Sequence, residues 1–474
     1  MTALAHADSA ARTAPAQALA ALWQKFGGDP TALEQVELTG SDPVLPSSFA
    51  VGTAAQASIA AAALAAAELW RLRTGQSQRI AVDMRHAAIE CRSERYLRVE
   101  GRSTPDLWDK IAGTYRCGDG RWVRLHTNFP HHRDGVLKLL GCAYDRDAVK
   151  RALQDWQAEA LETAAAEAGL VVTAMRSFAE WDAHPQGRAV ENLPVFSIER
   201  IGAAPAEPLP GAARPLSGVR VLDFTRIIAG PIAGRTLAAH GADVLLVTSP
   251  RLPSVEQLVI DTGRGKLSTH IDLRDAAGRD ALTRLLRSAD VFVQGYRPGG
   301  LAELGFGPQE AAKIRPGIVY VSLSAYGHEG PWRSRRGYDS LVQTASGFNH
   351  AEAQAAGSDK PHPLPMQVLD HATGYFMACG AMTALARRVR EGGSWHVRAS
   401  LAQTGNWVRN LGRVENGLVC PDPKIDDVRD LRAEAESGFG RLTFVRHAAR
   451  LSQTPPHWAR PSVPLGTHPP AWPP

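Results

Sequence analysis

Apolar and polar positions alternate most regularly between residues 217 and 330. Short apolar runs in this part are separated by amphipathic segments. Strands are predicted at 219–224, 243–247, 291–294 and 318–324, and helices at 230–240, 275–288 and 308–313. Strands that alternate with helices are typical of βαβ units. This part of the chain therefore predicts an α/β fold with a mostly parallel, Rossmann-like sheet.

The first 210 residues contain shorter elements. An alanine-rich stretch at 53–73 predicts a helix that ends before Gly75, and a strand is predicted at 78–82. Two further strands, 113–116 and 122–126, are predicted on either side of a Gly-Asp-Gly turn. More helices are predicted at 134–140, 146–168 and 177–183. Together these elements indicate a smaller α+β region.

Composition marks the boundaries between the regions. Residues 203–216 are rich in proline and alanine and contain few large apolar side chains, which indicates a linker. Eight prolines fall in the last twenty residues and predict an extended tail. We divide the chain into an N-terminal extension (1–44), the smaller α+β region (45–210), the α/β half (217–415) and a proline-rich C-terminal tail (416–474).

The sequence contains a weak internal repeat. Without a gap, residues 46–92 align with residues 363–409, and both copies carry Arg-x-Arg-x-Gly-x-Ser between a predicted helix and a predicted strand. Two alanine-rich helices that end at glycine can also match by chance, so that alternative stays open. In this register Thr53 aligns with Asp370, so only the second copy carries a carboxylate there.

Composition and charge argue against several classes of protein. With 44% hydrophobic and 21% charged residues, the chain is not disordered as a whole. Its net charge of +5 comes without a long Lys/Arg run, so no nucleic-acid partner is indicated and a local basic pocket for an anionic ligand fits as well. The five cysteines form no CxxC pair, so neither a zinc site nor a disulfide framework is indicated and a reducing compartment is expected.

The sequence gives little sign of export or membrane insertion. The N-terminal segment has no basic region followed by a continuous apolar core and is not typical of a signal peptide. The most apolar stretch, 58–69, is mostly alanine, contains Glu68 and is too short to span a bilayer. We therefore expect a soluble cytoplasmic protein without a membrane partner.

Common nucleotide-binding and catalytic motifs are absent from the sequence: there is no GxGxxG after the first strand of the α/β half, no P-loop, no HExxH and no GxSxG. The pair His131-His132 lacks companions at metal-ligand spacing and is interpreted as a polar loop feature, so no metal is expected. Gly230-Pro231 still places a helix N-terminus at the end of that first strand, where free N–H groups favour a polar or anionic ligand.

Asp370 begins a small, apolar predicted helix that contains Gly374 and Gly380. The residues alone leave two interpretations open. Aspartate commonly caps helix N-termini. A carboxylate in apolar surroundings can also act as a nucleophile that forms an acyl intermediate.

Several stretches of residues 217–401 resemble the family III CoA-transferases, the group of formyl-CoA transferase, carnitine CoA-transferase and α-methylacyl-CoA racemase. In chain order they are LSGVRVLDFTRIIAGP (216–231), GADV (241–244), RGKLSTHIDLRDAAGRDAL (264–282), ADVFVQGYRPGGLAELGFG (289–307), IVYVSLSAYGHEGPW (318–332), GYDSLVQTASG (337–347) and LDHATG (369–374). The resemblance implies an enzyme that moves CoA from an acyl-CoA donor to a carboxylic acid acceptor. It implies CoA and acyl-CoA as substrates and no permanently bound cofactor.

The resemblance also implies roles for individual residues. Asp370 would be the nucleophile that carries the acyl group. The CoA site would be formed by Ile228, Ala229, Ile271, Arg274, Gly295, Tyr296, Arg297, Arg336 and Asp339. Without the family, Ile271 is as well explained as a core residue, and Arg274 or Arg297 as a solvated surface charge.

The front of the chain resembles the same family in a different order. LRTGQSQRIAVDM (72–84) is similar to the segment that follows the catalytic helix, and DGRWVRL (119–125) is similar to part of the small-domain half. The resemblance implies that the halves are permuted or fused, with 45–210 packing as the small-domain partner of the sheet formed by 217–400. Because members of the family form interlocked dimers, we expect a homodimer.

Departures from the family leave two other functions open. Residues 246–248, Gly295 and Glu303 stand where members commonly have Lys-x-Glu, Asn and Arg. A protein that binds CoA without turnover is therefore one alternative. An acyl-CoA racemase is the other, although that branch has a histidine where this chain has Tyr338, which favours transfer.

Overall fold

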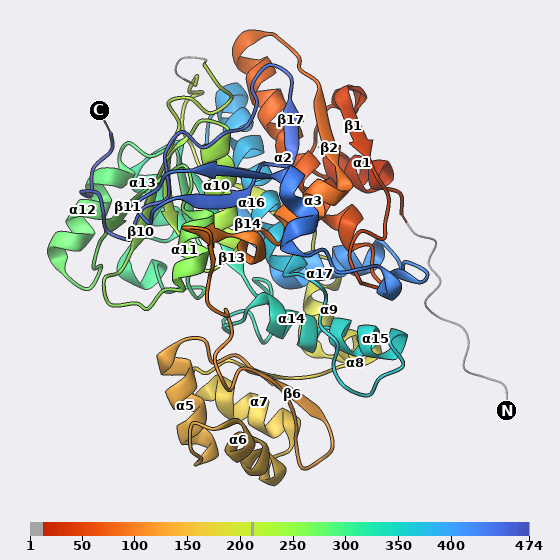
Figure 1. Ribbon diagram of the computed structural model, residues 1–474. Helices are drawn as coiled ribbons and strands as arrows, with labels where there is room; N and C mark the ends of the chain where they lie inside the picture. The colour runs from red at the N-terminus through yellow and green to blue at the C-terminus, as the bar shows by residue number, and fades with distance from the viewer. Residues whose placement is uncertain (1–12, 210–212, 474) are drawn as a thin grey trace.

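The computed structural model describes residues 13–209 and 213–473 (Figure 1). A seven-stranded sheet forms its centre, in the order β11-β10-β9-β12-β13-β14-β8. These strands are β8 (Phe196–Gly202), β9 (Arg220–Phe224), β10 (Asp243–Thr248), β11 (Lys266–His270), β12 (Val291–Gln294), β13 (Val319–Ser324) and β14 (Ser394–Ser400). Neighbouring strands are parallel except β14 and β8, which pair antiparallel. The predicted α/β class and mostly parallel sheet are confirmed.

Helices cover both faces of this sheet. They are α10 (Ala229–Ala239), α11 (Glu256–Thr262), α12 (Ala276–Leu286), α13 (Pro308–Ile314), α16 (Val368–Glu391) and α17 (Leu401–Asn410). Side chains alternate between the two faces along each strand. Leu222 and Phe292 pack in one core cluster with α12 and α13, whereas Val221 and Val293 pack in another with α10 and α16. Numbered from β9, the parallel strands stand in the order 3-2-1-4-5-6, so the order reverses between β9 and β12.

Two long helices, α2 (Val51–Thr74) and α16, pack against each other in the core (Figure 1). One shift in numbering maps both ends of α2 onto both ends of α16. The same shift maps Gly75, with φ of 74°, onto Gly392, with φ of 67°, and such angles favour glycine. β2 (Ile80–Asp83) follows α2 as β14 follows α16. The internal repeat is therefore present in the structure.

By length and composition, α2 is apolar enough to cross a membrane, and no other helix among the described residues is. However, 94% of its most apolar window is buried inside the protein. It packs against α1 (Pro15–Lys25), α3 (Met84–Glu90) and α16. α2 is therefore a core helix of the fold.

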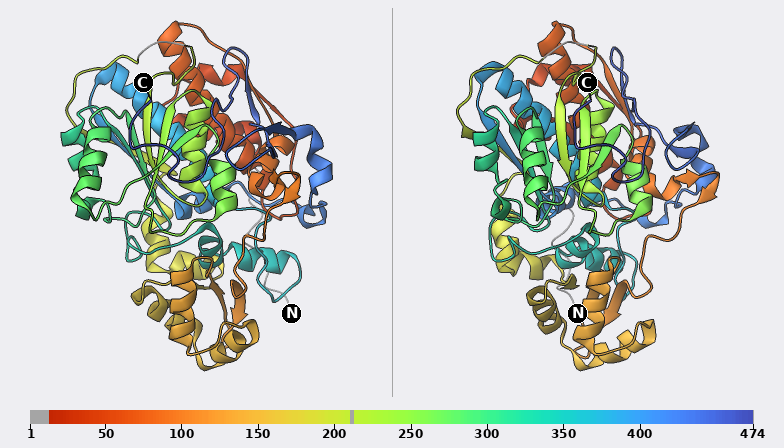
Figure 2. Two further views of the ribbon diagram at one scale, coloured as in Figure 1. Left: turned by 60° about the vertical axis from the view of Figure 1, so that its left-hand side comes forward. Right: turned by 90° about the vertical axis from the view of Figure 1, so that its left-hand side faces the viewer.

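A small lobe extends from one end of the molecule (Figure 2). It contains β5 (Gly113–Arg116), β6 (Trp122–Leu125), β7 (Val172–Ala174), α5 (Pro130–Leu140), α6 (Arg146–Ala152) and α7 (Ala158–Glu167), which pack around their own core. The prediction of one helix over 146–168 is wrong. The hairpin turn interrupts it, because Gly118 N–H donates to the carbonyls of Leu153 and Trp156, and Asp119 accepts from the first N–H of α7.

The region after α17 forms strands that pair with strands from the N-terminal part of the chain. Its strands are β15 (Arg432–Ala435), β16 (Leu442–Val445) and β17 (Ala449–Leu451). β17 pairs with β2, and β16 pairs with β3 (Arg98–Val99). The segment 455–473 has no helix or strand and runs beside β11: Gly265 N–H donates to the carbonyl of Arg460, and His468 N–H to that of Ser268.

Short elements connect these parts. They are the strands β1 (Val36–Thr39) and β4 (Arg102–Ser103), the helices α4 (Ser93–Tyr96), α8 (Phe178–Ala183), α9 (Pro185–Glu191), α14 (Asp339–Ala345) and α15 (Phe348–Ala355), and the 3₁₀ turns η1 (Pro30–Gln35), η2 (Leu153–Asp155), η3 (Ala302–Leu304), η4 (Gly417–Val419) and η5 (Ile425–Leu431). The loop between β13 and α14 and the helix α14 lie between the main body and the small lobe (Figure 1).

Candidate active site

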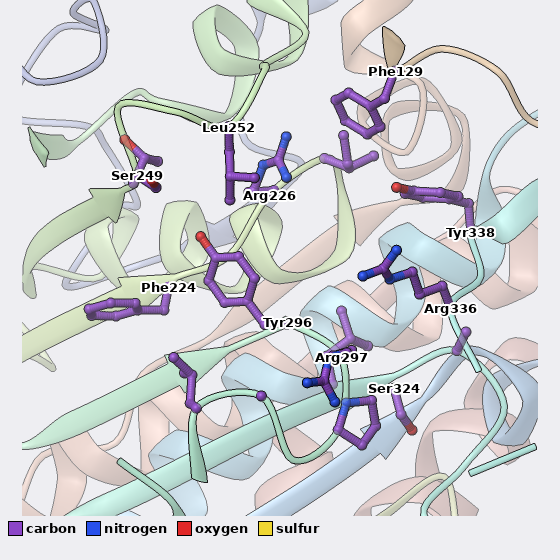
Figure 3. Close-up of a pocket in the computed structure, with 18 of the residues that line it drawn as sticks. Phe129, Phe224, Arg226, Ser249, Leu252, Tyr296, Arg297, Ser324, Arg336 and Tyr338 are labelled. Atoms are coloured by element: carbon purple, nitrogen blue, oxygen red, sulfur yellow. The ribbon is translucent and has the colours of Figure 1, made fainter. Parts of the chain in front are cut away.

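A cavity of about 600 Å³ lies at the carboxyl ends of the parallel strands and is called the first cavity below. Loops after β9, β10, β11, β12 and β13 form its wall. Figure 3 shows residues from four of them, such as Arg226, Ser249, Arg297 and Ser324. Open α/β sheets bind ligands at such an edge, where the strand order reverses. The predicted site residues that line this cavity are Ile228, Ala229, Ile271, Arg274, Gly295, Tyr296, Arg297, Arg336 and Asp370. Asp339 instead lines a second cavity, of about 490 Å³, which Asp370 also borders.

Asp370 lies in the first turn of α16 and lines both cavities. The residue is only 6% exposed, and its backbone N–H donates to Asp339 Oδ2 at 2.9 Å. Gln367 occupies the N-cap position, so the capping interpretation of Asp370 is wrong. Asp339 therefore holds the first turn of α16 through the backbone of Asp370, and its contact with CoA stays a prediction.

Three carboxyl groups gather around this turn. Burial raises the pKa of Asp370 well above its usual range, and the negative charges of Asp339 and Glu94 raise it further. Burial also raises the pKa of Asp339, to about 6, although hydrogen bonds from Asp370 N–H and Gln343 oppose the rise. Burial would raise the pKa of Glu94 too, but His371 Nε2, 3.5 Å away, brings it below its usual value. Asp339 and Asp370 together therefore hold a proton to higher pH than ordinary aspartates do.

These raised pKa values predict a pH-dependent stability. A carboxyl whose pKa is raised by folding stabilises the protein below the ordinary aspartate value near 4, and this stability is lost as pH rises through the raised value. We expect Asp370→Asn to be more stable than the wild type near pH 8 and about equally stable near pH 4, because the amide carries no charge to bury. Chemical unfolding at both pH values measures this, with the surface variant Asp280→Asn as control. A difference that does not change with pH would contradict it.

The three predicted phosphate-binding arginines border the first cavity from different loops. Figure 3 labels two of them, Arg297 and Arg336. Arg274 donates through Nε and Nη2 to Asp272, at 3.0 and 2.7 Å. Arg297 Nη2 lies 2.6 Å from Glu303 Oε2. Arg336 Nη1 donates to the carbonyl of Gly169 in the small lobe, at 3.0 Å. All three side chains are exposed, so an anion can reach them, although two would share their charge with a carboxylate.

The loop after β9 contains two residues that the sequence analysis did not select. Arg226 lines the first cavity, and its guanidinium lies 4.8 Å from the ring centre of Phe129. Ile227 borders both cavities and has a φ of 77°, which is costly for a β-branched residue. Backbone strain of this kind concentrates at functional sites. The sequence signal that could have identified Arg226 and Ile227 is their position just after the predicted strand 219–224.

The small lobe contributes histidines to the site. His131 and His132 line the first cavity from the first turn of α5, so their interpretation as a loop feature is wrong. His132 is 2% exposed, neither of its ring nitrogens has a hydrogen-bond partner among the described residues, and burial lowers its pKa to about 3. His126 stacks on Tyr338 with ring centres 4.0 Å apart. Within residues 13–209 and 213–473, no group of His, Cys, Asp and Glu is arranged to hold a metal ion.

A buried ion pair supports the loop after β9 from below. Lys266 Nζ lies 2.8 Å from Asp223 Oδ2 and donates to the carbonyl of Pro231 in α10 at the same distance. Both side chains are almost completely buried. Asp223 also accepts a short hydrogen bond from the hydroxyl of Thr225, the first residue of the loop. The pair thus connects β9, β11 and α10 beneath Arg226 and Ile227.

The α2 copy of the repeat differs at the position of Asp370. Thr53 stands there, and both its N–H and its hydroxyl donate to Asp42, at 3.0 and 2.7 Å. Asp42 is therefore placed relative to α2 as Asp339 is relative to α16. Both carboxylates follow a Gly-x sequence, Gly40-Ser41-Asp42 and Gly337-Tyr338-Asp339, although their spacing to the helix differs between the two copies.

The chain belongs to CoA-transferase family III, whose family model matches residues 31–206 and 216–413. Membership identifies an enzyme that transfers CoA. The predicted resemblance is confirmed, and it extends to the first half of the chain. The match falls on both sides of the predicted linker.

Several curated proteins that are similar to this chain are named as CoA-transferases. An acyl-CoA transferase of Gibberella moniliformis is 29% identical over 79% of this chain and 74% of its own length. A probable fatty acyl-CoA transferase of Mycobacterium tuberculosis is 30% identical over 53% of this chain and 69% of its own. Mouse succinyl-CoA:glutarate CoA-transferase is 34% identical over 38% and 43%. A crystal structure of the mycobacterial protein aligns with a TM-score of 0.38 and 36% identity, over 40% of this chain and 54% of that one, about half the length of the solved relative.

Proposed function

We propose that this protein moves CoA from an acyl-CoA donor to a carboxylic acid acceptor through an acyl group carried by Asp370. The observation that carries the proposal is the position of Asp370, a buried carboxyl group between two cavities in a chain of CoA-transferase family III. One cavity lies at the sheet edge and suits CoA, and the other is available to the acid. Asp370, which both cavities reach, can act on both substrates in turn.

The proposed chemistry proceeds by acyl exchange. Asp370 reacts as the carboxylate, after its proton has passed to solvent: one oxygen attacks the thioester carbonyl carbon, the C–S bond breaks, and CoA leaves as the thiolate. The product is a mixed anhydride between Asp370 and the donor acyl group. The acceptor carboxylate attacks the aspartyl carbonyl and displaces the donor carboxylate. The thiolate then attacks the acceptor acyl carbon, which forms the new thioester and releases Asp370. These three displacements replace one difficult direct exchange.

Backbone N–H groups near Asp370 would stabilise the oxyanions of these steps. Gly374 lies one turn after Asp370 on the same side of α16. A Cβ at Gly374 would lie 2.5 Å from the carbonyl oxygen of Ala229, so α10 begins close to α16. The first N–H groups of a helix have no partners within that helix, and oriented N–H groups of this kind stabilise developing negative charge. This close approach supports a role for Ile228 and Ala229 beside the reacting carbonyl.

The first cavity is the proposed CoA site. The strand order 3-2-1-4-5-6 supports the Rossmann-like prediction, because such sheets bind nucleotides where the order reverses. Arg226, Arg274, Arg297 and Arg336 provide positive charge for the phosphates. The predicted permutation of the halves stays a proposal, supported by the two matched segments.

Replacing an arginine of the first cavity by alanine should weaken CoA binding. For Arg274, Arg297 and Arg336 we expect a loss of about ten- to a hundredfold each, because a charge-assisted contact contributes roughly 1.5–3 kcal/mol. Added salt should weaken wild-type binding as well, since exposed phosphate contacts are screened. Titration calorimetry at low and high salt measures both effects. Arg333→Ala is the control, because Arg333 is exposed and does not line the cavity. Near-neutral results for all three variants would place CoA elsewhere.

The acyl intermediate can be tested directly. The wild-type protein is incubated with an acyl-CoA donor alone, digested, and examined by mass spectrometry for acyl groups on the peptide that contains Asp370. An added acceptor acid should remove the label and yield its own CoA thioester. Turnover without acyl transfer to this peptide would contradict the proposed mechanism.

The alternatives are less well supported. Racemisation needs an acid/base pair at the α-carbon of the acyl group. Burial raises the pKa of Tyr338 to about 12 and lowers that of its neighbour His126 to about 3, so neither suits proton exchange near neutral pH. A CoA-binding protein without turnover would bind CoA but leave Asp370 unmodified in the same experiment. The expected homodimer and the soluble, cytoplasmic location stay predictions, and light scattering tests the first.

A further inference from the structure

The proposed exchange leaves a CoA thiolate in the first cavity while the acceptor acid displaces the donor carboxylate. During this interval the thiolate has to stay next to Asp370, because it attacks the new acyl carbon in the last displacement. A thiolate is stabilised by hydrogen-bond donors and by nearby positive charge. A site that keeps it reactive has to offer both without giving it a proton.

The junction between the two cavities defines where the sulfur of CoA would lie. The residues that line both cavities are Phe129, Ile227, Ile228, Tyr338 and Asp370. His132 lines the first cavity, and its ring centre lies 5.9 Å from that of Phe129 and 6.3 Å from that of Tyr338. His132 therefore stands beside the junction, on the side of the proposed CoA site. The phosphates of CoA lie at the other end of its pantetheine arm, so the group that His132 would meet is the sulfur end.

The His132 side chain has hydrogen-bonding capacity that the protein does not use. It is almost completely buried, and neither ring nitrogen has a partner among the described residues. Buried polar groups are nearly always hydrogen-bonded in folded proteins, so this imidazole indicates a ligand that completes it. One of the two ring nitrogens of a neutral imidazole carries a hydrogen and can donate it.

The unpaired positive charge of the first cavity is concentrated near His132. Four arginines of the lining lie within 4.0 Å of a carboxylate: Arg251 and Arg274 with Asp272, Arg297 with Glu303, and Arg335 with Glu162. Arg226 and Arg336 also line the cavity and have no carboxylate within that distance in residues 13–209 and 213–473. Each donates to a backbone carbonyl. In Figure 3, these two side chains surround the same part of the cavity as Phe129 and Tyr338.

His132 stays uncharged beside these two guanidinium groups. Burial is the main reason that its pKa is lowered to about 3, and the charges of His131, Arg336 and Arg226 lower it further. A neutral imidazole donates a hydrogen bond to a thiolate but does not give up its remaining proton near neutral pH. The sulfur would therefore be held as an anion and stay nucleophilic.

We propose that His132 donates a hydrogen bond to the CoA thiolate and, with the positive charge of Arg226 and Arg336, holds this anion beside Asp370 between the first and the last displacement. The inference rests on the proposed CoA transfer and adds a binding site for its leaving group. His132 exchanges no proton with the sulfur and forms no bond to the acyl group.

The contribution of the sulfur to CoA binding tests the proposal. The wild type is titrated by calorimetry with CoA and with S-methyl-CoA, whose methyl group prevents ionisation, near pH 9, above the ordinary pKa of a cysteine thiol of about 8.5. We expect CoA to bind at least about tenfold more tightly, since a hydrogen bond to a charged group contributes a factor of this order. The preference should be smaller near pH 6, because the thiol then has to lose its proton to solvent before it binds as an anion.

Two variants of His132 separate hydrogen bonding from packing. His132→Phe keeps a ring and removes the donor, so it should reduce the preference for CoA to about threefold or less. His132→Gln, whose amide can donate, should retain more of the preference. His132→Phe should be at least as stable as the wild type in chemical unfolding, because it removes buried polar atoms that lack partners. His457→Phe is the matched control, since His457 is exposed and lines neither cavity.

The outcomes distinguish this proposal from the proposed function. A wild type without preference, a preference that survives in His132→Phe, or an equal fall in affinity for both ligands would overturn the proposal, because His132 would then not contact the sulfur. Each of these results leaves the proposed CoA transfer intact. Failure of the wild type to bind either ligand would contradict the proposed CoA site, and the thiolate site with it.

Discussion

Asp370→Asn should abolish CoA transfer. The amide has nearly the shape of the carboxyl group but cannot form the anhydride, and loss of a covalent nucleophile commonly lowers kcat by about ten-thousandfold or more. CoA binding should be almost unaffected, because the arginines of the first cavity lie on other loops. Rates are measured with one donor and acceptor pair, and CoA affinity by calorimetry on the same preparation.

The control for this experiment is Asp280→Asn, a change on the exposed side of α12. The Asp370→Asn protein should also be more stable than the wild type near neutral pH, so unfolding cannot account for lost activity. Substantial turnover in Asp370→Asn would assign the acyl group to another carboxylate. Glu94 and Asp339, which border the second cavity, would then be the first candidates.

Lys266→Met should have the largest effect on stability. It removes the charge that neutralises Asp223, 2.8 Å away in a completely buried site. An uncompensated buried charge of this kind costs about 3–5 kcal/mol in the free energy of unfolding. Because Asp223 also holds Thr225, the loop with Arg226 and Ile227 should loosen, and CoA affinity should fall with it. Chemical unfolding and calorimetry measure the two losses.

Removing both charges tests the cause. The double variant Asp223→Asn/Lys266→Met should recover at least half of the lost stability, since neutral replacements of a buried pair are often tolerated. Lys313→Met on the exposed side of α13 is the control for lysine replacement in general. If the double variant were as unstable as Lys266→Met, packing of the lysine side chain and not its charge would explain the loss.

The α/β half could be predicted from sequence because its strands are buried on both faces. Buried strands form apolar runs, and the predicted strand 291–294 agrees with β12 at both ends. The helix predicted over 146–168 failed because its interruption depends on a distant hairpin turn. Gly118 and Asp119 take the hydrogen bonds there, and local propensity contains no information about such contacts.

Site residues could be predicted from the sequence where a family motif places them in a loop that follows a strand. Arg274 lies in the loop after β11 and Arg297 in the loop after β12, and both line the first cavity. His132 comes from the small lobe, and only the folded chain brings it to the first cavity. Asp339 borders the second cavity and accepts a hydrogen bond from the backbone of Asp370, and sequence spacing cannot distinguish such a contact from a ligand contact.

The pairing of α2 with α16 has a consequence for stoichiometry. Each chain contains two helices of the same design in contact, yet the position equivalent to Asp370 in α2 is Thr53, whose hydroxyl is already bound to Asp42. One polypeptide should therefore accept a single acyl equivalent, so a rapid burst of released thiol would reach one per chain. α2 therefore contributes to the fold through its packing against α16. Its sequence has to preserve that packing, but it does not have to preserve a reactive carboxylate.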